Sequence, residues 1–262
     1  MSTIGVFDSG IGGLSILNEA LLQSPGHHYL YLADSAHAPY GEKSTQWVTD
    51  RSLLLCSWLI KQGCDAVVVA CNTATTQAIA LIREKFPEVP IIGVEPGIKP
   101  ASATSQKKIV GVLATQNTLN SDKFKLLLAS LNDNCEFIQQ AGHGLVPLIE
   151  HGILNGPEIE SLLHQYLDPM LDQGADTLVL GCTHYPFLQD VIEKVYGDRL
   201  QIIDTSQAVV RQLFRLIKGS ESKKSGKVDV FSSQDGGILL ELAQKLLPHP
   251  YLLNAKAQTV SI

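Results

Sequence analysis

The sequence has few of the features that mark secreted, disulfide-bonded or membrane proteins. Its five cysteines are an odd number and include no CxxC pair, so neither a disulfide framework nor a thioredoxin-type motif is expected. The first ten residues, MSTIGVFDSG, lack the basic and apolar segments of a secretory signal. Apolar stretches are interrupted within about ten residues, which is too short to cross a bilayer. We therefore expect a soluble, cytoplasmic chain without a membrane partner.

Charge is also sparse and unclustered. The 262 residues carry 20 Lys and Arg against 26 Asp and Glu, which gives a formal net charge of −6. No long run of Lys or Arg is present, so no nucleic-acid partner is indicated. Any anionic substrate must be held by local hydrogen-bond donors. Because 45% of the residues are hydrophobic, the chain has room for one large domain or two small ones.

Short runs of Val, Ile and Leu alternate with longer amphipathic segments. Runs without polar alternation are typical of parallel strands buried on both faces, and their alternation with helices predicts an α/β fold. The expected strands are residues 4–7, 29–33, 66–70, 91–94, 109–113, 177–181, 201–203 and 228–231. The clearest expected helices are residues 44–62, 73–86, 157–172 and 206–217.

Two segments of the chain resemble each other. Residues 62–73 are QGCDAVVVACNT and residues 173–184 are QGADTLVLGCTH. Five of the twelve positions are identical, and one of these is the cysteine close to the end of each segment. Weaker similarities, in the same order, pair residues 4–9 with 110–115 and residues 91–92 with 202–203. Since internal repeats indicate duplicated architecture, we expect two related α/β lobes.

The repeat places Cys71 and Cys182 at the same point of the two lobes, directly after a buried strand. Ligands of parallel sheets bind at the carboxyl ends of the strands. A turn that leads into a helix lowers the pKa of a thiol and offers free N–H groups to a carboxylate. The other cysteines, Cys56, Cys64 and Cys135, are expected to be inert and buried.

Two thiols that approach one carbon from opposite sides suit inversion of that carbon. One thiolate would remove the α-proton, and the opposite thiol would deliver a proton to the other face. The neighbours of the two thiols differ. Asp8 ends a strand that is expected to lie beside the Cys71 strand, and it would either activate Cys71 or bind the substrate ammonium. His184 follows Cys182 by two residues and would activate that thiol.

Two nucleotide-binding motifs are incomplete. Ser15 stands where the third glycine of G-x-G-x-x-G belongs, and the GEKS segment at residues 41–44 lacks the Gly-Lys-Ser/Thr of a P-loop. Residues 34–41, DSAHAPYG, are rich in turn formers, and by themselves they fit either a surface turn or part of a site.

Five segments closely resemble motifs of glutamate racemases, within the wider aspartate/glutamate racemase superfamily. They are VFDSGIGGLS (6–15), ADSAHAPYG (33–41), VVACNTAT (68–75), GVEPG (93–97) and GCTHYP (181–186). The resemblance covers essentially the whole chain. It implies cofactor-independent interconversion of L- and D-glutamate, which supplies D-glutamate for peptidoglycan. It also implies two pseudo-symmetric parallel-sheet lobes, residues 1–97 plus 206–262 and residues 98–205, with the active site in the cleft between them.

The resemblance further implies roles for individual residues. Cys71 and Cys182 are the expected catalytic thiols, assisted by Asp8 and His184. The residues expected to line the substrate are Asp8, Ser9, Tyr40, Gly41, Asn72, Thr73, Thr118, Glu150, Thr183 and His184. The chain departs from the family pattern at one place. Many members carry Cys-Pro shortly before the VPLIE segment, where this chain has Gly142 and His143.

Several alternatives stay open at this stage. An aspartate racemase differs only in the size of the pocket for the side-chain carboxylate. A zinc site of Cys71, Cys182 and His184 would match no compact zinc motif. A pyridoxal phosphate enzyme needs a Schiff-base lysine, and only Lys43 and Lys99 stand near the motifs. A non-catalytic binding module would have no use for two cysteines. The sequence does not determine the oligomeric state, and a homodimer is one candidate assembly.

Overall fold

The computed structural model describes residues 1–131, 135–217, 226–247 and 249–262. The chain forms two compact units. Unit 1 comprises Met1–Val94 together with Ser206–Ile262, and unit 2 comprises Glu95–Thr205. The chain therefore leaves unit 1 after its first 94 residues and returns to it at Ser206.

Unit 1 is built on a six-stranded parallel sheet with the order β10-β9-β2-β1-β3-β4. Its strands are β1 (Thr3–Asp8), β2 (His28–Ala33), β3 (Ala66–Val69), β4 (Ile91–Gly93), β9 (Lys227–Ser232) and β10 (Lys256–Thr259). The central strands β1, β2 and β3 are buried along nearly their whole length. Burial on both faces explains why their sequences are almost continuously apolar.

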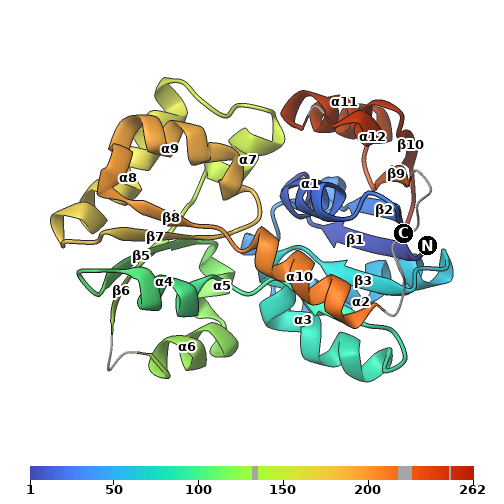
Figure 1. Cartoon of the computed structure of the whole chain (residues 1–262), viewed down its shortest axis with the longest axis horizontal. Coiled ribbons are helices and arrows are strands. Elements are labelled where there is room, and N and C mark those ends of the chain that lie inside the picture. Colours follow the sequence, from blue (N-terminus) through green and yellow to red (C-terminus); the bar gives the residue numbers. More distant parts are fainter. Residues whose placement is uncertain (132–134, 218–225, 248) are drawn as a thin grey trace. The chain divides into compact units, whose positions relative to one another are not determined.

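Helices pack against the sheet of unit 1 (Figure 1). They are α1 (Leu14–Gln23), α2 (Thr45–Lys61), α3 (Asn72–Lys85), α10 (Ser206–Leu216), α11 (Gly236–Leu246) and α12 (Pro250–Leu253), with short 3₁₀ turns η1 (Ser35–His37) and η2 (Tyr40–Glu42). Helices α1 and α10 contact each other, as do α2 and α3. The side chains of α2 and α3 form one hydrophobic cluster with those of β1, β2 and β3.

Unit 2 is built on a four-stranded parallel sheet with the order β6-β5-β7-β8. Its strands are β5 (Ile109–Ala114), β6 (Glu136–Ala141), β7 (Thr177–Gly181) and β8 (Gln201–Ile203). Its helices are α4 (Ile98–Thr104), α5 (Gln116–Asn120), α6 (Asp122–Ala129), α7 (Leu145–Glu150), α8 (Pro157–Asp172) and α9 (Gln189–Tyr196), with 3₁₀ turns η3 (Tyr185–Leu188) and η4 (Gly197–Arg199). Within this unit, Figure 1 shows α8 and α9 on one face of the sheet and α4 and α6 on the other.

The two sheets share one topology over four strands. The order β2-β1-β3-β4 in unit 1 corresponds to β6-β5-β7-β8 in unit 2. The three sequence similarities fall on equivalent strands: β1 with β5, the cysteine strands β3 with β7, and β4 with β8. The expected α/β fold with parallel strands is confirmed, and Cys71 and Cys182 follow equivalent strands.

Two strands have no counterpart in the sequence prediction. β6 and β10 both lie at the edge of their sheet, and most of their residues are exposed or half-buried. An edge strand whose side chains are largely exposed does not require a continuous apolar sequence, so its sequence resembles that of a polar loop.

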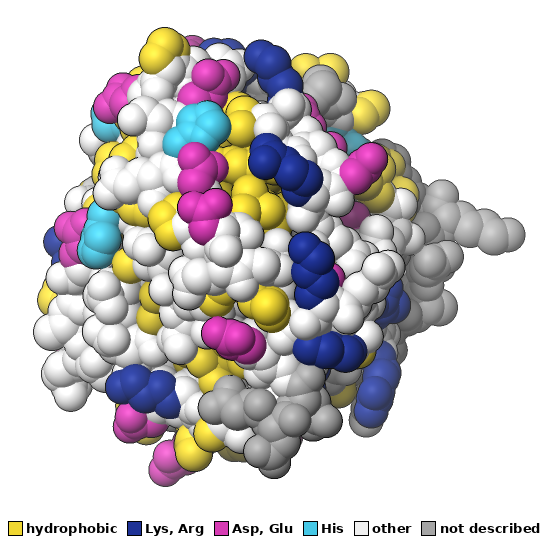
Figure 2. Space-filling view, turned by 90° about the vertical axis from the view of Figure 1, so that its left-hand side faces the viewer, with side chains coloured by type: hydrophobic (Ala, Val, Ile, Leu, Met, Phe, Trp, Pro, Cys, Tyr) yellow, Lys and Arg dark blue, Asp and Glu magenta, His cyan; other side chains and the backbone are white. Residues whose placement is uncertain are grey.

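No helix among the described residues is long and apolar enough to cross a membrane. Figure 2 shows Lys and Arg side chains interspersed with Asp and Glu on one face of the molecule.

Candidate active site

Polar side chains gather where the central strands of unit 1 end. β1 pairs in register with both β2 and β3, so that Asp8 lies opposite Ala33 and Phe7 lies opposite Val69. Parallel strands end at the same edge of a sheet, which brings the residues after β1 and β3 together. The Sγ of Cys71 lies 3.8 Å from the Oγ of Ser9. The expected proximity of the first and third strands is therefore present in unit 1.

The group around Cys71 is shielded from solvent. Cys71 is 5% exposed and the Asp8 side chain is fully buried. One oxygen of Asp8 accepts a hydrogen bond from the N–H of Gly10 at 2.9 Å, which fixes the carboxylate in the turn after β1. Asp8 and Cys71 therefore both lie in surroundings from which water is largely excluded.

Cys71 is the N-cap residue of α3. The first turn of that helix contains Asn72 and Thr73, which are both buried. The side-chain amide of Asn72 donates to the carbonyl of Val94 at 3.3 Å. The prediction that Cys71 lies in a strand-to-helix turn is confirmed. Cys71 thus lies at the amino-terminal end of a helix, where the helix dipole generally favours a thiolate over a thiol.

Tyr40 and Gly41 lie in the η2 turn, and both are buried. Segment 34–41 is therefore more than a surface turn. The hydroxyl of Tyr40 donates to Asp34 at 2.5 Å, and Tyr40 belongs to the same packed cluster as Cys71. Burial is the main cause that raises the pKa of the Tyr40 phenol, with further contributions from the charges of Asp34 and Cys71. Tyr40 therefore stays protonated.

In unit 2 the corresponding edge carries Cys182, Thr183 and His184, which are all buried. One part of the prediction is wrong here. Cys182 was expected to lie close to the start of the next helix, but the chain first forms the 3₁₀ turn η3, and α9 begins only at Gln189. Pro186 stands in the first positions of η3, where its fixed φ suits a helical turn.

The imidazole of His184 lies between two partners. Its Nδ1 is 3.7 Å from the Sγ of Cys182, and its Nε2 is 2.5 Å from Oε1 of Glu150. Burial alone would lower the pKa of His184, because it disfavours the charged ring. Hydrogen bonds and charges from Cys182 and Glu150 act in the opposite direction and raise the pKa of His184 well above 6.5. The charged form of the His184 ring is therefore favoured, and it lies beside the sulfur of Cys182.

Thr118 and Gly142 complete the edge of the sheet in unit 2. Thr118 is fully buried in α5, and its N–H donates to the side chain of Thr115, the residue that follows β5. Gly142 follows β6, and a β-carbon at this position would lie 2.4 Å from the hydroxyl of Tyr185. A residue larger than glycine at this position would therefore require the Tyr185 side chain to shift.

The remaining cysteines show no sign of chemical activity. All five cysteines are buried and none forms a disulfide within the described residues, and burial raises the pKa of both Cys56 and Cys64 to about 12. Among the described residues of either unit, no group of three or more His, Cys, Asp and Glu side chains is arranged to hold a metal ion. Lys43 and Lys99 are exposed, so neither occupies the desolvated setting that activates a Schiff-base lysine.

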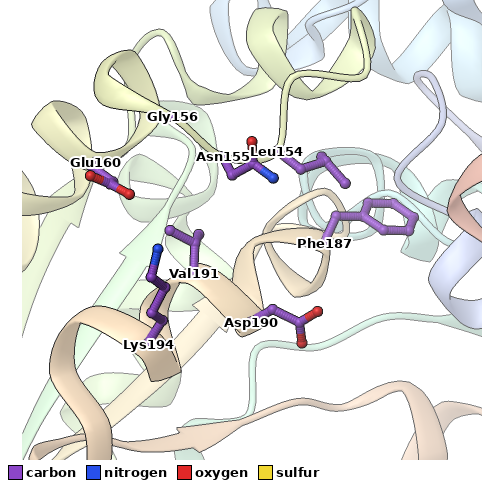
Figure 3. Close-up of a pocket in the computed structure, with 8 residues that line it drawn as sticks. All are labelled: Leu154, Asn155, Gly156, Glu160, Phe187, Asp190, Val191 and Lys194. Atoms are coloured by element: carbon purple, nitrogen blue, oxygen red, sulfur yellow. The ribbon is translucent and has the colours of Figure 1, made fainter.

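Unit 2 also contains a pocket of about 460 Å³ between the segment that precedes α8 and the start of α9 (Figure 3). Its lining residues are Leu154, Asn155, Gly156, Glu160, Phe187, Asp190, Val191 and Lys194. None of the site residues expected from the sequence lines it, and it presents no thiol and no imidazole. The pocket therefore lies outside the chemistry of Cys182.

Sequence reasoning missed Asp34 and Arg51. Asp34 is fully buried and binds Tyr40, and Arg51 from the middle of α2 forms an ion pair with it. Asp34 stood in a recognisable motif, and a carboxylate directly after a buried strand was a usable signal. Arg51 had none, because a single arginine in an amphipathic helix is usually a surface residue.

Taken by itself, each unit presents one buried thiol at the end of an equivalent strand, beside a polar side chain. The neighbour of Cys71 in unit 1 is the Ser9 hydroxyl, and the neighbour of Cys182 in unit 2 is the His184 imidazole. A thiol with such a neighbour can remove or supply a proton near neutral pH.

Several known proteins are similar to this chain in sequence and in fold. A family model for Asp/Glu/Hydantoin racemases matches residues 13–213. The glutamate racemase of Ralstonia pickettii is 56% identical over 239 residues, which cover 91% of this chain and 84% of that protein. The structure of glutamate racemase from Francisella tularensis in complex with D-glutamate matches with a TM-score of 0.83 at 29% identity, over 100% of this chain and 97% of that one.

The Escherichia coli glutamate racemase, solved with L-glutamate and the activator UDP-MurNAc-ala, matches with a TM-score of 0.84 at 32% identity, over 94% of this chain and 95% of that one. Because the sequences are highly identical over most of their length and the fold is also shared, the family assignment does not rest on the fold alone. The chain belongs to the Asp/Glu/Hydantoin racemase family and is an amino-acid racemase.

Proposed function

We propose that this chain interconverts L- and D-glutamate without a cofactor, and that Cys71 and Cys182 are its two acid/base groups. The observation that carries the proposal is the equivalence of the two thiols. Each follows the corresponding strand of a sheet, the two sheets share one strand order over four strands, and each thiol is buried beside a different polar side chain. The names of the curated relatives point to glutamate as the substrate.

The proposed reaction moves protons only. One thiolate takes the α-hydrogen as a proton and forms an S–H bond, while the electron pair of the broken C–H bond stays on the α-carbon. The other thiol donates its proton to the opposite face of that carbon and keeps its own electron pair as a thiolate. No group is oxidised or reduced, and the two cysteines finish with their protonation states exchanged.

The neighbouring groups take different parts. Asp8, with Ser9, assists Cys71, and His184, held by Glu150, assists Cys182. The glutamate itself is bound by polar groups that surround the two thiols, so that no positive field of the whole molecule is needed. Besides Asp8, Ser9, Glu150 and His184, these groups are Tyr40, Gly41, Asn72, Thr73, Thr118 and Thr183. The proposal requires that one glutamate molecule reach both thiols.

The test is racemisation in heavy water. L-glutamate is incubated with the protein in D₂O, and circular dichroism follows the loss of optical activity while mass spectrometry counts deuterium in each enantiomer. We expect the newly formed D-glutamate to carry one solvent deuterium before the recovered L-glutamate does. Transfer of the original hydrogen to the product would contradict a two-base mechanism. L-aspartate is assayed in parallel, and faster turnover of L-aspartate would assign the chain to aspartate instead.

D-glutamate made in this way supplies peptidoglycan synthesis, and the proposed location is the cytoplasm. A strain that requires external D-glutamate should grow without it when it expresses the chain, and it should not grow when it expresses a variant that lacks Cys71. The proposed assembly is a homodimer, which sedimentation velocity of the purified protein measures directly.

A further inference from the structure

The carboxylate of Asp34 is fully buried, and it accepts hydrogen bonds from three side chains. Arg51 donates from Nε to one oxygen at 2.8 Å and from Nη2 to the other at 2.6 Å. Tyr40 donates its hydroxyl at 2.5 Å, and the Nδ1 of His37 lies 3.0 Å away. Burial raises the pKa of Asp34, but the hydrogen bonds from Arg51, Tyr40 and His37 outweigh burial and lower it to about 2. The carboxylate is therefore ionised across the physiological range.

Arg51 is held from two sides. Its side chain is 10% exposed. Beyond the two bonds to Asp34, its Nη1 donates to the backbone carbonyl of Ile262 at 2.5 Å. Ile262 packs against the same hydrophobic cluster that contains Tyr40 and Cys71. A guanidinium supplies this fixed fork of donors to two partners at once, which a lysine ammonium cannot reproduce.

The chain of contacts ends at Tyr40. The indole ring of Trp47 meets the ring of Tyr40 edge-on, with centroids 5.3 Å apart. The Tyr40 ring is thus held by packing and its hydroxyl by Asp34. The η2 turn that carries Tyr40 contacts α3, the helix that Cys71 caps. A shift of the Asp34 carboxylate would therefore move a side chain packed close to a proposed catalytic thiol.

We propose that Arg51 and Asp34 are positioning residues for substrate binding: the guanidinium fixes the carboxylate, and the carboxylate holds the Tyr40 hydroxyl in place beside Cys71. The proposal rests on the proposed racemisation of glutamate, in which Tyr40 lines the substrate. Arg51 itself does not touch the substrate. Its loss should weaken the binding of glutamate through Tyr40 while leaving the proton-transfer groups as they are.

The test is a double-mutant cycle between Arg51 and Tyr40, with KM and kcat measured for both enantiomers of glutamate. Arg51→Lys keeps the positive charge beside buried Asp34 but loses the fork. Tyr40→Phe removes the hydroxyl that Asp34 holds. Arg83→Lys is the matched control, because Arg83 donates from Nε to the backbone carbonyl of Ile91 elsewhere in the same unit. Urea unfolding midpoints of all variants separate loss of folding from loss of binding.

We expect Arg51→Lys to raise KM roughly fivefold with kcat within about twofold, the size of effect that one displaced hydrogen bond produces. Tyr40→Phe should raise KM at least as much, and the double variant should match Tyr40→Phe, because Arg51 acts only through that hydroxyl. A wild-type KM in Arg51→Lys or in Tyr40→Phe, or KM effects that multiply in the double variant, would overturn the proposal.

Two controls keep the test decisive. If Arg51→Lys does not fold, the pair Arg51→Gln and Asp34→Asn takes its place in the cycle with the same expected pattern, because replacing both members leaves no buried charge without a counter-charge. Turnover of glutamate by the wild type and by Arg83→Lys tests the proposed activity separately. Absent turnover in both would sink the activity, whereas normal turnover with multiplicative KM effects would sink only the role of Arg51.

Discussion

Glu150 lies 2.5 Å from Nε2 of His184, and the sulfur of Cys182 lies 3.7 Å from Nδ1 of the same ring. Both nitrogens of a buried imidazole are therefore committed, one to a carboxylate and one to a thiol. In unit 1, the sulfur of Cys71 lies beside the Ser9 hydroxyl. The two thiols therefore have different neighbours, even though they follow equivalent strands.

Replacing Glu150 by Gln should destabilise the protein in a pH-dependent way. The pKa of His184 in the folded protein is raised above 6.5. The stabilisation that protonated His184 contributes is therefore fully present below pH 6.5, and it is lost as pH rises through the folded pKa. Glutamine removes the charge that contributes to the rise. At pH values between about 4.3, the ordinary pKa of glutamate, and 6.5, we expect the free energy of unfolding of Glu150→Gln to be about 1.5–3 kcal/mol lower than that of the wild type.

Urea unfolding of the wild type and Glu150→Gln from pH 5 to pH 9 measures this difference. The difference in free energy of unfolding between the two proteins should become smaller toward alkaline pH. A gap that stays constant across the range would mean that Glu150 acts without its charge, as a packing residue. Glu193→Gln is a suitable control, since Glu193 is exposed on α9 of the same unit and accepts a hydrogen bond from Gln189.

Cys71→Ser and Cys182→Ser should each lower kcat for racemisation by about 10²–10⁴-fold, the usual contribution of a general acid or base. The two variants should also differ from each other. With one base left, each should exchange the α-proton of only one glutamate enantiomer with D₂O, and the enantiomer should be opposite in the two variants. NMR of the α-proton measures this exchange.

Cys135→Ser is the matched control for these variants, because Cys135 is as buried as Cys71, at 5% exposure, and lies in unit 2. It should racemise glutamate at close to the wild-type rate. Exchange of the same enantiomer by Cys71→Ser and Cys182→Ser would rule out the assignment of one thiol to each face.

Gly142→Ala should destabilise the protein by about 1–3 kcal/mol, the typical cost of overpacking. The new β-carbon would lie 2.4 Å from the hydroxyl oxygen and 2.9 Å from Cζ of Tyr185. Adding Tyr185→Phe removes the nearer of these atoms, so the double variant should recover part of the loss. Thermal unfolding of the two single variants and the double variant measures the recovery. Strictly additive losses would show that the clash is relieved in another way.

Asp176→Ala should destabilise unit 2 more strongly near pH 7 than near pH 3. Its carboxylate accepts hydrogen bonds from the Ser105 hydroxyl and from the backbone N–H groups of Gln106 and Lys107. Burial raises the pKa of Asp176, but these bonds outweigh burial and lower the pKa below its ordinary value. The stabilisation is therefore present above the unfolded pKa of about 3.9 and is lost as pH falls through the folded value.

Chemical denaturation at the two pH values checks this prediction, with an expected loss of about 1–3 kcal/mol at pH 7. Asp198→Ala serves as the control, because Asp198 is exposed in the η4 turn of the same unit. Equal losses for Asp176→Ala at both pH values would mean that the ionised form has no advantage.

The buried strands were predictable from sequence because their environment forces an apolar run. β7 and β8 have the predicted bounds, and β1 and β3 differ from prediction only at their ends. β6 and β10 were not predictable, since an edge strand is free to be polar. The expected neighbourhood of Cys71 followed from the same logic, because adjacent parallel strands end at one edge.

Other parts of the candidate site depend on contacts between residues far apart in the chain. Arg51 binds Asp34 across 17 positions and Ile262 across 211, and no periodicity records such a pair. Tyr185, the first residue of the 3₁₀ turn after Cys182, donates its hydroxyl to the carbonyl of Gly142, 43 positions away. Hydrophobic patterning indicates which residues are buried, but it does not indicate which polar partners meet inside.

The return of the chain to unit 1 has a consequence for synthesis on the ribosome. β9 lies between β2 and β10, so Lys227–Ser232 must pair with His28–Ala33 before the sheet of unit 1 is complete. Unit 2, in contrast, is one continuous segment, Glu95–Thr205. Since domains fold as units during translation, the inserted unit is able to fold first. Until β9 is made, more than a hundred residues later, the edge of β2 that pairs with it stays open.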